Sequence, residues 1–272
     1  MFIILYFIYK LFYKIFFYVL PEEWSVKIIS EYNNKYYILK KNSNEYYADP
    51  FVYKIFDKIY LVYETYDKIN KTGRISLCIF NSQLRLIEKI QSLININTHC
   101  SYPFILELHD NIYMIPETSK NKSLSVWVFD KEKKFNFLKD VLIDVELVDT
   151  NVYLIDNLLY YVSTDIRDSY NTIYFITDLD FNVIKFPLKF NEILKFRNAG
   201  VIYDNINLKI TQNRTANYYG TNIIFNTIDF SKNIISPNNV DYNLIVLNKY
   251  FGVHHFVKNK DLITFDFKYH KR

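Results

Sequence analysis

Apolar and polar positions along this chain follow a pattern that repeats about every fifty residues. Residues 47–64 (YADPFVYKIFDKIYLVYE) return, loosely rewritten, as residues 100–117 (CSYPFILELHDNIYMIPE), which lie 53 positions further on without a gap. A third copy lies 100 positions after the first, and an aspartate, two valines and two tyrosines match there: Asp149, Val152, Tyr153, Tyr160 and Val162. The chain therefore contains at least three related units.

Each of these units holds short runs that are apolar or alternate between apolar and polar residues, with polar turns between them. Such runs are typical of antiparallel strands. The first unit contains YADPFVY, KIYLVYE, RISLCIF and LIEKIQSL, the second SYPFILEL, NIYMIPE, LSVWVFD and FNFLKDVLI, and the third VDTNVYLI, LLYYVSTD, TIYFITD and FNVIKFPL. Four strands in a repeat of roughly 50 residues predict the blade of a β-propeller.

Two further units complete the predicted ring. The fourth begins at Arg197 (RNAGVIYD) and continues with INLKITQN, YYGTNIIFNTIDF and YNLIVLN. The fifth begins at Gly252 (GVHHFV) and has one more run, DLITFDFKY, so its other two strands must come from the amino end, WSVKIISE and YYILK. Closure of the ring by both ends removes exposed sheet edges. We predict an all-β fold, a five-bladed propeller with four-stranded antiparallel blades, in a single domain of residues 21–272.

The first twenty residues (MFIILYFIYKLFYKIFFYVL) differ from the rest because they are almost wholly apolar. They are long enough to span a bilayer. Lys10 and Lys14 near the middle cost about 5–7 kcal/mol of insertion free energy, while the Phe, Ile, Leu and Val residues return roughly 4–8 kcal/mol. Both lysines share one helix face, which also suits a helix lying in the interface. We predict a membrane-associating segment over residues 1–20, with packing against the propeller as the alternative.

Composition supports strands and excludes some functions. The 26 Tyr and 23 Phe residues are strand formers, and only four Gly and six Pro residues punctuate the chain. The net charge is +4, and the longest basic run, KEKK at residues 131–134, is interrupted by an acid, so we expect no nucleic-acid partner. Cys78 and Cys100 are the only cysteines. Because they make no disulfide framework, we expect a cytoplasmic location, membrane-associated on the cytoplasmic face.

Polar residues lie where successive units begin. They are Asp49, the segment from His99 to Tyr102, Asp149, Arg197 and His254. Because the first strands of all blades surround one channel, we expect these side chains to meet at its mouth. Carboxylates accept hydrogen bonds from sugar hydroxyls and arginine donates them, so the cluster suits a polyhydroxylated ligand. The alternative for any one of these residues is a structural cap on a turn or strand end.

Two glutamates end the second strands of the first two units, Glu64 and Glu117. Cleavage of a glycosidic bond needs two carboxyl groups, about 5–5.5 Å apart for retention of configuration and 6.5–9.5 Å apart for inversion. Asp49 with Glu117 or with Asp149 is the candidate catalytic pair.

Metal and cofactor chemistry lack a sequence signal. His254 and His255 are adjacent, so on a regular strand they point to opposite faces. There is no HExxH motif, no pair of CxxC motifs and no glycine-rich phosphate loop. We therefore expect neither a metal nor a cofactor.

Eight short segments, in order and at suitable spacing, resemble a known domain. They are EEWSV (22–26), YYADPF (46–51), HCSYPF (99–104), YMIPE (113–117), VDTNVY (148–153), FRNAG (196–200), TQNRTANYYG (211–220) and GVHHF (252–256). Together they resemble the five-bladed propeller at the amino end of plant glucosamine inositolphosphorylceramide transferases, over residues 22–267. In those proteins the transferase chemistry is attributed to a separate carboxy-terminal domain. The family often has an acid where this chain has Asn213, which puts a charged role at that position in doubt.

A more distant resemblance is to propeller glycosidases of the arabinanase, levansucrase and invertase type, whose catalytic acids lie in the central channel. It implies that Asp49 occupies the place of the first-blade catalytic aspartate, with Glu117 and Asp149 as its candidate partners.

Three hypotheses follow from the pattern and the resemblance. The first is a carbohydrate-binding or carbohydrate-processing propeller for surface polysaccharide or glycolipid assembly, associated with a glycosyltransferase. Its ligand would contact residues that share a polar or aromatic side chain: Glu64, His99, Tyr102, Arg197, Gln212, Tyr219 and His254. The second is a glycoside hydrolase or phosphorylase, and the third is a non-catalytic scaffold that docks a transferase. Whether the chain is an enzyme stays open at this point.

Overall fold

The computed structural model describes residues 24–40, 42–168, 171–192, 196–212, 223–238 and 252–268. Strands make up most of this part, and its one short helical turn is η1 (Ser119–Asn121). The apolar segment predicted over residues 1–20 lies outside the described residues. Within them, no helix has the length and apolar character that a membrane crossing requires.

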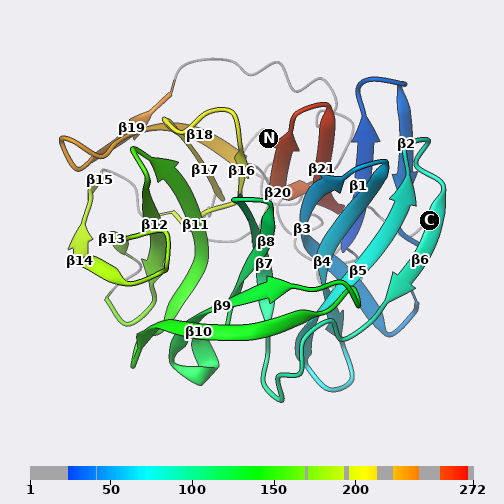
Figure 1. Cartoon of the computed structure of the whole chain (residues 1–272), viewed down its shortest axis with the longest axis horizontal. Coiled ribbons are helices and arrows are strands. Elements are labelled where there is room, and N and C mark those ends of the chain that lie inside the picture. The colour runs from blue at the N-terminus through cyan, green and yellow to red at the C-terminus, as the bar shows by residue number, and fades with distance from the viewer. Residues whose placement is uncertain are drawn as a thin grey trace, which may run out of the picture.

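The first three blades are four-stranded antiparallel sheets that match the three repeated units (Figure 1). The first consists of β3 (Glu45–Ile55), β4 (Lys58–Asp67), β5 (Thr72–Asn81) and β6 (Leu86–Ile90). The second consists of β7 (Ser101–Leu108), β8 (Asn111–Glu117), β9 (Ser123–Phe129) and β10 (Phe135–Ile143). The third consists of β11 (Leu147–Ile155), β12 (Leu158–Asp165), β13 (Asn171–Thr177) and β14 (Val183–Lys189).

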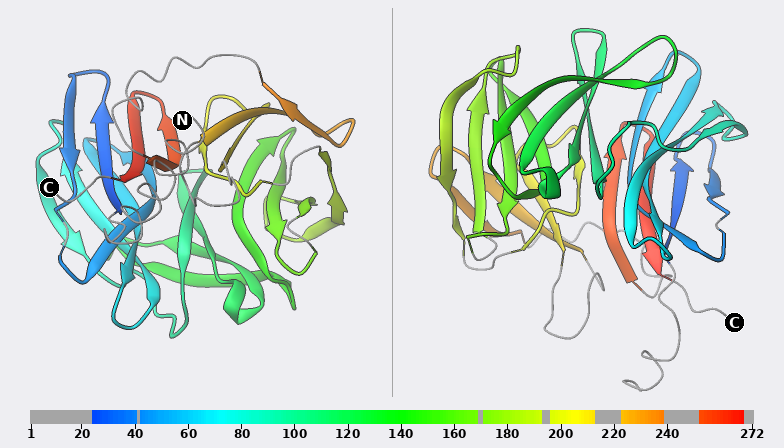
Figure 2. Two further views of the ribbon diagram at one scale, coloured as in Figure 1. Left: turned by 180° about the vertical axis from the view of Figure 1, so that it is seen from behind. Right: turned by 90° about the horizontal axis from the view of Figure 1, so that it is seen from below.

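The fifth blade joins the two ends of the chain. Its strands are β20 (Gly252–Asn259), β21 (Leu262–Lys268), β1 (Trp24–Ser30) and β2 (Lys35–Ile38), in that order across the sheet. Both views of Figure 2 show β1 and β2 in blue beside β21 in red. The predicted five-bladed propeller, closed by amino-terminal strands, is therefore confirmed.

The fourth blade differs in detail from the prediction. It contains β17 (Leu208–Gln212), β18 (Ile223–Asp229), β19 (Ile234–Pro237) and the short β15 (Asn191–Glu192), which runs parallel to β19. The predicted first strand supplies β16 (Gly200–Ile202), which pairs in parallel with β20 of the fifth blade instead of opening the fourth. The predicted last strand, YNLIVLN, lies outside the described residues.

The pairing of β16 with β20 depends on Gly200. Its φ is +99°, a conformation that side chains rarely adopt, and a Cβ placed there would lie 2.0 Å from the carbonyl oxygen of Phe256. Only glycine allows the two backbones to approach this closely, so Gly200 permits the pairing of β16 with β20.

A bulge interrupts the innermost strand of four blades. The register shifts between Ala48 and Phe51 in β3, between Ser101 and Phe104 in β7, between Val148 and Asn151 in β11, and between Val253 and Phe256 in β20. Three bulge residues at the repeat offsets have positive φ: Asp49 (48°), Tyr102 (43°) and Asp149 (51°). A bulge re-aims the side chains at the point where it occurs. The repeated unit therefore places side chains that depart from the regular strand alternation at equivalent points around the axis.

Aromatic rings fill the space between blades. Phe51 of the first blade contacts Phe104 of the second at 5.4 Å between ring centroids, and Tyr153 of the third contacts Phe230 beside the fourth at 5.7 Å. Such edge-to-face pairs add to the free energy gained by burying their area. This packing accounts for the high Tyr and Phe content.

We expect Gly200→Ala to lower the free energy of unfolding by more than about 1 kcal/mol, because the new methyl group collides with the Phe256 carbonyl and the backbone is strained. Lys54→Ala, at an exposed position of β3, is the control and should stay within about 0.5 kcal/mol of the wild type. Urea unfolding measures both. If both variants unfold at the same urea concentration as the wild type, the backbones of β16 and β20 do not pack closely at Gly200.

Candidate functional site

A cavity of about 240 Å³ opens beside the bulges of β3 and β20. Acidic, basic and aromatic side chains line it: Trp24, Tyr46, Ala48, Asp49, Glu64, Tyr66, His99, Ser101, Glu117, Arg197 and His254. The predicted site residues Asp49, Glu64, His99, Glu117, Arg197 and His254 thus meet around one space, although they lie far apart in the sequence. Tyr219 lies outside the described residues.

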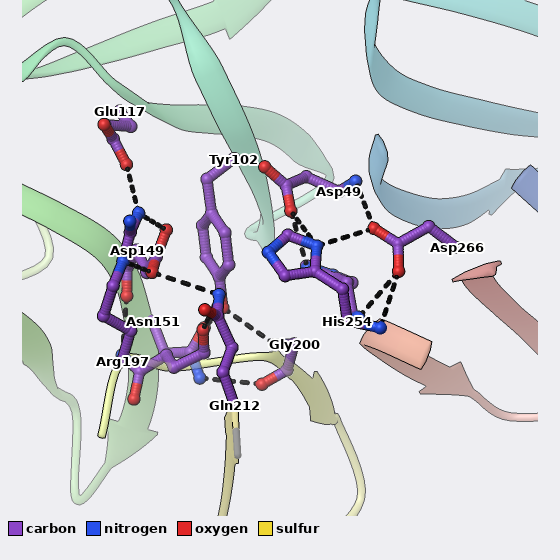
Figure 3. A network of polar contacts seen from close by, with 12 residues as sticks. Asp49, Tyr102, Glu117, Asp149, Asn151, Arg197, Gly200, Gln212, His254 and Asp266 are labelled. Carbon is purple, nitrogen blue, oxygen red and sulfur yellow. Dashed lines mark hydrogen bonds and ion pairs between the residues drawn. The ribbon is translucent and has the colours of Figure 1, made fainter. Parts of the chain in front are cut away.

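Arg197 connects two of the predicted acids. Its guanidinium donates to both carboxylate oxygens of Asp149, with Nη2 2.8 Å from Oδ1, and Nη2 also lies 3.2 Å from Oε2 of Glu117 (Figure 3). Two-point contact of this kind fixes the orientation of the guanidinium. Gln212 supports the arrangement with Nε2 3.5 Å from Oδ2 of Asp149. Asp149 and Gln212 lie behind Arg197 and are not among the described residues that line the cavity.

Asp266 on β21 holds the bulges of the first and fifth blades together. Its Oδ2 accepts the backbone N–H of Asp49 at 3.1 Å, and its Oδ1 accepts those of His254 and His255 at 3.0 and 2.8 Å. Oδ2 also lies 2.9 Å from Nδ1 of His254 (Figure 3). A carboxylate only accepts, so Nδ1 of His254 carries the proton. This fully buried acid positions Asp49 and His254.

Sequence reasoning missed Asp266 because it lies on the second strand of its blade. The available signal was one acid inside an apolar run, LITFDF. Aspartate is almost never fully buried unless it has partners.

Tyr102 supports the centre of the ring and is fully buried, away from the cavity. Its hydroxyl donates to Oδ1 of Asn151 at 2.8 Å and accepts the N–H of Gly200 at 2.9 Å. Asn151 in turn donates to the carbonyl of Gly200 at 2.9 Å (Figure 3). These contacts hold β16 in the middle of the propeller. The predicted ligand contact through Tyr102 therefore has no support in its position.

The imidazole of His99 is uncharged and faces Glu64. Nδ1 of His99 accepts the backbone N–H of Gly73 at 2.8 Å, which leaves the proton on Nε2, 3.9 Å from Oε1 of Glu64. Burial lowers the pKa of His99 and favours this uncharged state. A Cβ on Gly73 would lie 2.2 Å from Oε1 of Glu64, so the close approach of these groups requires glycine there.

The carboxyl groups of the cavity have very different pKa values. Burial, opposed by Arg197 and assisted by the carboxylates of Asp149 and Asp49, raises the pKa of Glu117 to about 8. Burial and the neighbouring Asp49 and Glu117 raise the pKa of Glu64 well above its usual range. Burial also acts to raise the pKa of Asp49, but the contacts with His255, His254 and Arg197 outweigh it and lower the value to about 2. At neutral pH the site therefore holds an ionised acid beside protonated ones.

The oxygen or nitrogen atoms of Asp49, His254 and Asp266 lie within 4.8 Å of one another, a spacing that would suit a metal ion. However, Nδ1 of His254 is engaged with Asp266, whose oxygens already accept backbone N–H groups. Hydrogen bonds among the three groups thus hold the cluster together.

A family model described as "Glucosamine inositolphosphorylceramide transferase 1, N-terminal" matches residues 35–233. The chain belongs to this family. A rice protein, glucosamine inositolphosphorylceramide transferase 1 of Oryza sativa subsp. indica, is 30% identical over 122 residues, which cover 45% of this chain and 16% of the rice protein. The Arabidopsis thaliana protein of the same name is 25% identical over 127 residues, with the same two shares. The chain thus spans only about one sixth of the curated relatives it matches.

Solved structures of propeller glycosidases share the fold. The catalytic domain of Coprinopsis cinerea GH62 α-L-arabinofuranosidase superposes with a TM-score of 0.56 at 13% identity, over 86% of this chain and 83% of that one. An α-L-arabinofuranosidase of Clostridium thermocellum gives 0.55 at 13% identity, over 79% of each chain. Both resemblances expected from the sequence are confirmed. The family match places the chain among carbohydrate-related propellers, and the solved structures share its fold.

We expect Asp266→Asn to lower the free energy of unfolding by about 3 kcal/mol, because it disrupts a buried carboxylate that accepts three backbone N–H groups. Asp261→Asn, in the turn of the same hairpin, should change it by less than about 0.5 kcal/mol. Chemical denaturation compares the two. If both variants unfold at the same denaturant concentration, Asp266 does not hold the bulges.

The raised pKa of Glu117 predicts that its contribution to stability is complete below pH 4.5 and is lost as pH rises towards about 8, because the folded state binds the proton more tightly than the unfolded one. A difference of one pH unit between the folded and unfolded pKa is worth about 1.4 kcal/mol. Glu117→Gln should therefore be less sensitive to pH than the wild type between pH 5 and 9. The control is Glu132→Gln, in an exposed turn. Parallel stability curves for all three proteins would contradict the assignment.

Proposed function

We propose that this propeller binds a glycan, or another sugar-containing molecule, in the cavity beside β3 and β20. The observation that carries the proposal is the mixture of groups in that cavity. An ionised acid (Asp49), protonated acids (Glu64 and Glu117) and a guanidinium (Arg197) share one small space with aromatic side chains. Pockets of this kind combine apolar walls with a few placed polar groups, which fix the orientation of a ligand.

Each kind of side chain has a role towards a sugar. The rings of Trp24, Tyr46 and Tyr66 offer flat apolar surface to the C–H face of a pyranose or furanose. The carboxylate of Asp49 accepts hydrogen bonds from hydroxyls. The protonated Glu117 donates to hydroxyl or ring oxygens, and the guanidinium of Arg197 places a positive charge beside them. Because Asp149 fixes Arg197 from behind, this charge needs no rearrangement when the ligand arrives.

The names of the relatives support a role in glycolipid or surface-glycan assembly, since they describe transfer to inositolphosphorylceramide. We propose that the propeller serves such a reaction by holding a sugar-containing substrate or product for a glycosyltransferase. Contact of residues 1–20 with the cytoplasmic face of a membrane would bring the cavity near lipid-linked sugars. That part of the proposal rests on the apolar sequence of the segment alone.

A second candidate function is cleavage of a glycosidic bond, which the separation of pKa values favours. Glu117 would give its proton to the leaving oxygen, and Asp49 would either attack the anomeric carbon or take a proton from an attacking water molecule. Arg197 would then hold Glu117 in place through its 3.2 Å contact. Asp149 is excluded from the reacting pair in this scheme because Arg197 occupies its carboxylate.

A glycan array tests the proposal. The wild type should bind one class of glycan, and Asp49→Asn should weaken that binding at least about tenfold, because it removes the charge that accepts from hydroxyls. Asp57→Asn, on the exposed turn between β3 and β4, is the matched control and should bind like the wild type. An activated aryl glycoside assayed with the same three proteins tests cleavage.

The outcomes separate the candidate functions. Binding without turnover supports a carbohydrate-binding propeller, and turnover that is lost in Asp49→Asn supports a glycosidase. If no glycan binds and Asp49→Asn still captures a transferase partner as well as the wild type does, the propeller is a scaffold and the proposal is wrong.

A further inference from the structure

Lysines gather on the loops beside the cavity in the first and second blades. The Tyr46–Tyr66 pair, whose rings stack with 4.6 Å between centroids, lines the cavity where the β2–β3 and β4–β5 connections join their strands. Glu117 marks the same point for the β8–β9 connection. In these three connections and in β6–β7, the described residues include no acid and five lysines: Lys40, Lys68, Lys71, Lys120 and Lys122. We call this end of the blades the cavity end.

The opposite end of the first, second and fifth blades has no such excess of cations. Its described turns contain nearly equal numbers of acids and cations: Glu31, Asp57, Asp110, Asp130, Glu132 and Asp261 against Arg85, Lys131, Lys133, Lys134 and Lys260. Beside the lysines of the cavity end, Asp67 accepts two backbone N–H groups of its own turn, and Glu45 pairs with Arg74. The lysine surface ends at the β10–β11 connection, which contains Asp144 and Glu146. Positive charge is thus concentrated on one part of one end.

Contacts between the loops join these lysines into one surface. The backbone N–H of Lys68 donates to the carbonyl of Asn44 at 2.9 Å, which holds the β4–β5 turn against the β2–β3 connection. The hydroxyl of Thr98 donates to Oδ1 of Asn121 at 2.6 Å, which holds the β6–β7 connection against the β8–β9 turn. The lysine side chains therefore project from neighbouring loops of fixed relative position.

The kind of cation indicates the kind of partner. Arginine recognises a single phosphate or carboxylate through two-point contacts, whereas lysine is a flexible point charge. Lysines spread over several loops attract a layer of negative charge, such as the anionic headgroups of a bilayer, and each one adds to the binding. Ile69, between Lys68 and Lys71, is 70% exposed and offers an apolar side chain to the boundary between headgroups and acyl chains. This combination fits a membrane surface.

The start of β1 lies at the same end of the propeller. Trp24 is its first residue, lines the cavity and pairs with Lys268, whose Nζ lies 5.9 Å from the centre of the Trp24 ring. Only four peptide units separate Trp24 from Leu20, the last residue of the apolar segment, so at most about 14 Å lies between them. The other end of β1, at Ser30, is about 20 Å further away. A bilayer that holds residues 1–20 therefore lies near the cavity end.

We propose that the lysine surface of the cavity end binds a membrane that contains anionic lipids, with the cavity facing the bilayer. The lysines interact with lipid phosphates, and Ile69 enters the interface. This inference goes beyond the proposed glycan binding, because it concerns the loops around the cavity and holds whatever ligand the cavity takes. It gives the propeller a fixed orientation, in which a ligand attached to a lipid reaches the cavity from the membrane side.

Sedimentation with vesicles measures this binding on the full chain. We expect vesicles of phosphatidylcholine with phosphatidylserine to bind at least about tenfold more tightly than vesicles of phosphatidylcholine alone, and added salt to remove the difference. Lys68→Glu/Lys71→Glu should weaken binding to the anionic vesicles at least about tenfold. Lys131→Glu/Lys134→Glu is the matched control, since it reverses two lysines at the same spacing in a turn of the opposite end. It should bind like the wild type.

Tryptophan fluorescence tests the orientation, because Trp24 and Trp127 are the only two tryptophans of the chain. Anionic vesicles that contain brominated lipids quench a tryptophan close to the bilayer. Trp127→Phe leaves Trp24 at the cavity end, and its fluorescence should be quenched. Trp24→Phe leaves Trp127 on β9, away from the cavity lining, and its fluorescence should change little.

The outcomes separate this inference from the proposed function. Equal binding to both kinds of vesicle, an equal loss in the control variant, or equal quenching of the two tryptophans overturns the inference. On the glycan array, Lys68→Glu/Lys71→Glu should bind like the wild type. If it loses glycan binding and keeps vesicle binding, the lysines serve an anionic glycan and the inference is wrong. If anionic vesicles bind as expected but no glycan does, the inference stands and the proposed function fails.

Discussion

One buried carboxylate joins the closure of the ring to the construction of the site. Asp266 accepts the backbone N–H groups of Asp49, His254 and His255 and contacts the imidazole of His254. Those groups belong to the bulges of the first and last blades, which meet where the ends of the chain come together. Without this acceptor, three N–H groups would be buried with no partner, a cost comparable to a large share of the stability of a domain. The same contact therefore stabilises the seam and aims two side chains at the cavity.

The propeller uses one backbone feature for three purposes. Asp49, Tyr102 and Asp149 occupy equivalent bulges, and all have φ near +50°. Asp49 lines the cavity, Tyr102 holds Gly200 at the centre of the ring, and Asp149 binds Arg197. Left-handed conformations outside glycine cost free energy and persist where the surrounding structure imposes them. Repetition of the blade thus preserves the bulge, while the residue at each bulge takes a different role.

Crowding of acids in a small space produces the chemistry of the cavity. Asp49 stays ionised because histidines and Arg197 surround it, and this negative charge helps to keep the protons on Glu64 and Glu117. The same functional group therefore has two roles in the cavity: the ionised Asp49 accepts hydrogen bonds, and the protonated Glu64 and Glu117 donate them. Either carbohydrate binding or acid–base catalysis can use this division. Arg197 reduces the crowding only in part, because its Nε and Nη2 groups both donate to Asp149.

The sequence by itself determined the number of blades, the closure by amino-terminal strands and the placing of Asp49 and Asp149 at equivalent positions, because local alternation and fixed repeat offsets record these features. Only the tertiary structure decided that Asp149 faces Arg197, that β16 crosses to β20, and that Asp266, Trp24 and the Tyr46–Tyr66 pair belong to the site. The contact between Asp49 and Asp266 joins residues 217 positions apart. A bulge also turns side chains away from the faces that strict alternation assigns to them. Long-range contacts and redirected side chains produce no local pattern in the sequence. These groups therefore become neighbours only when the chain folds.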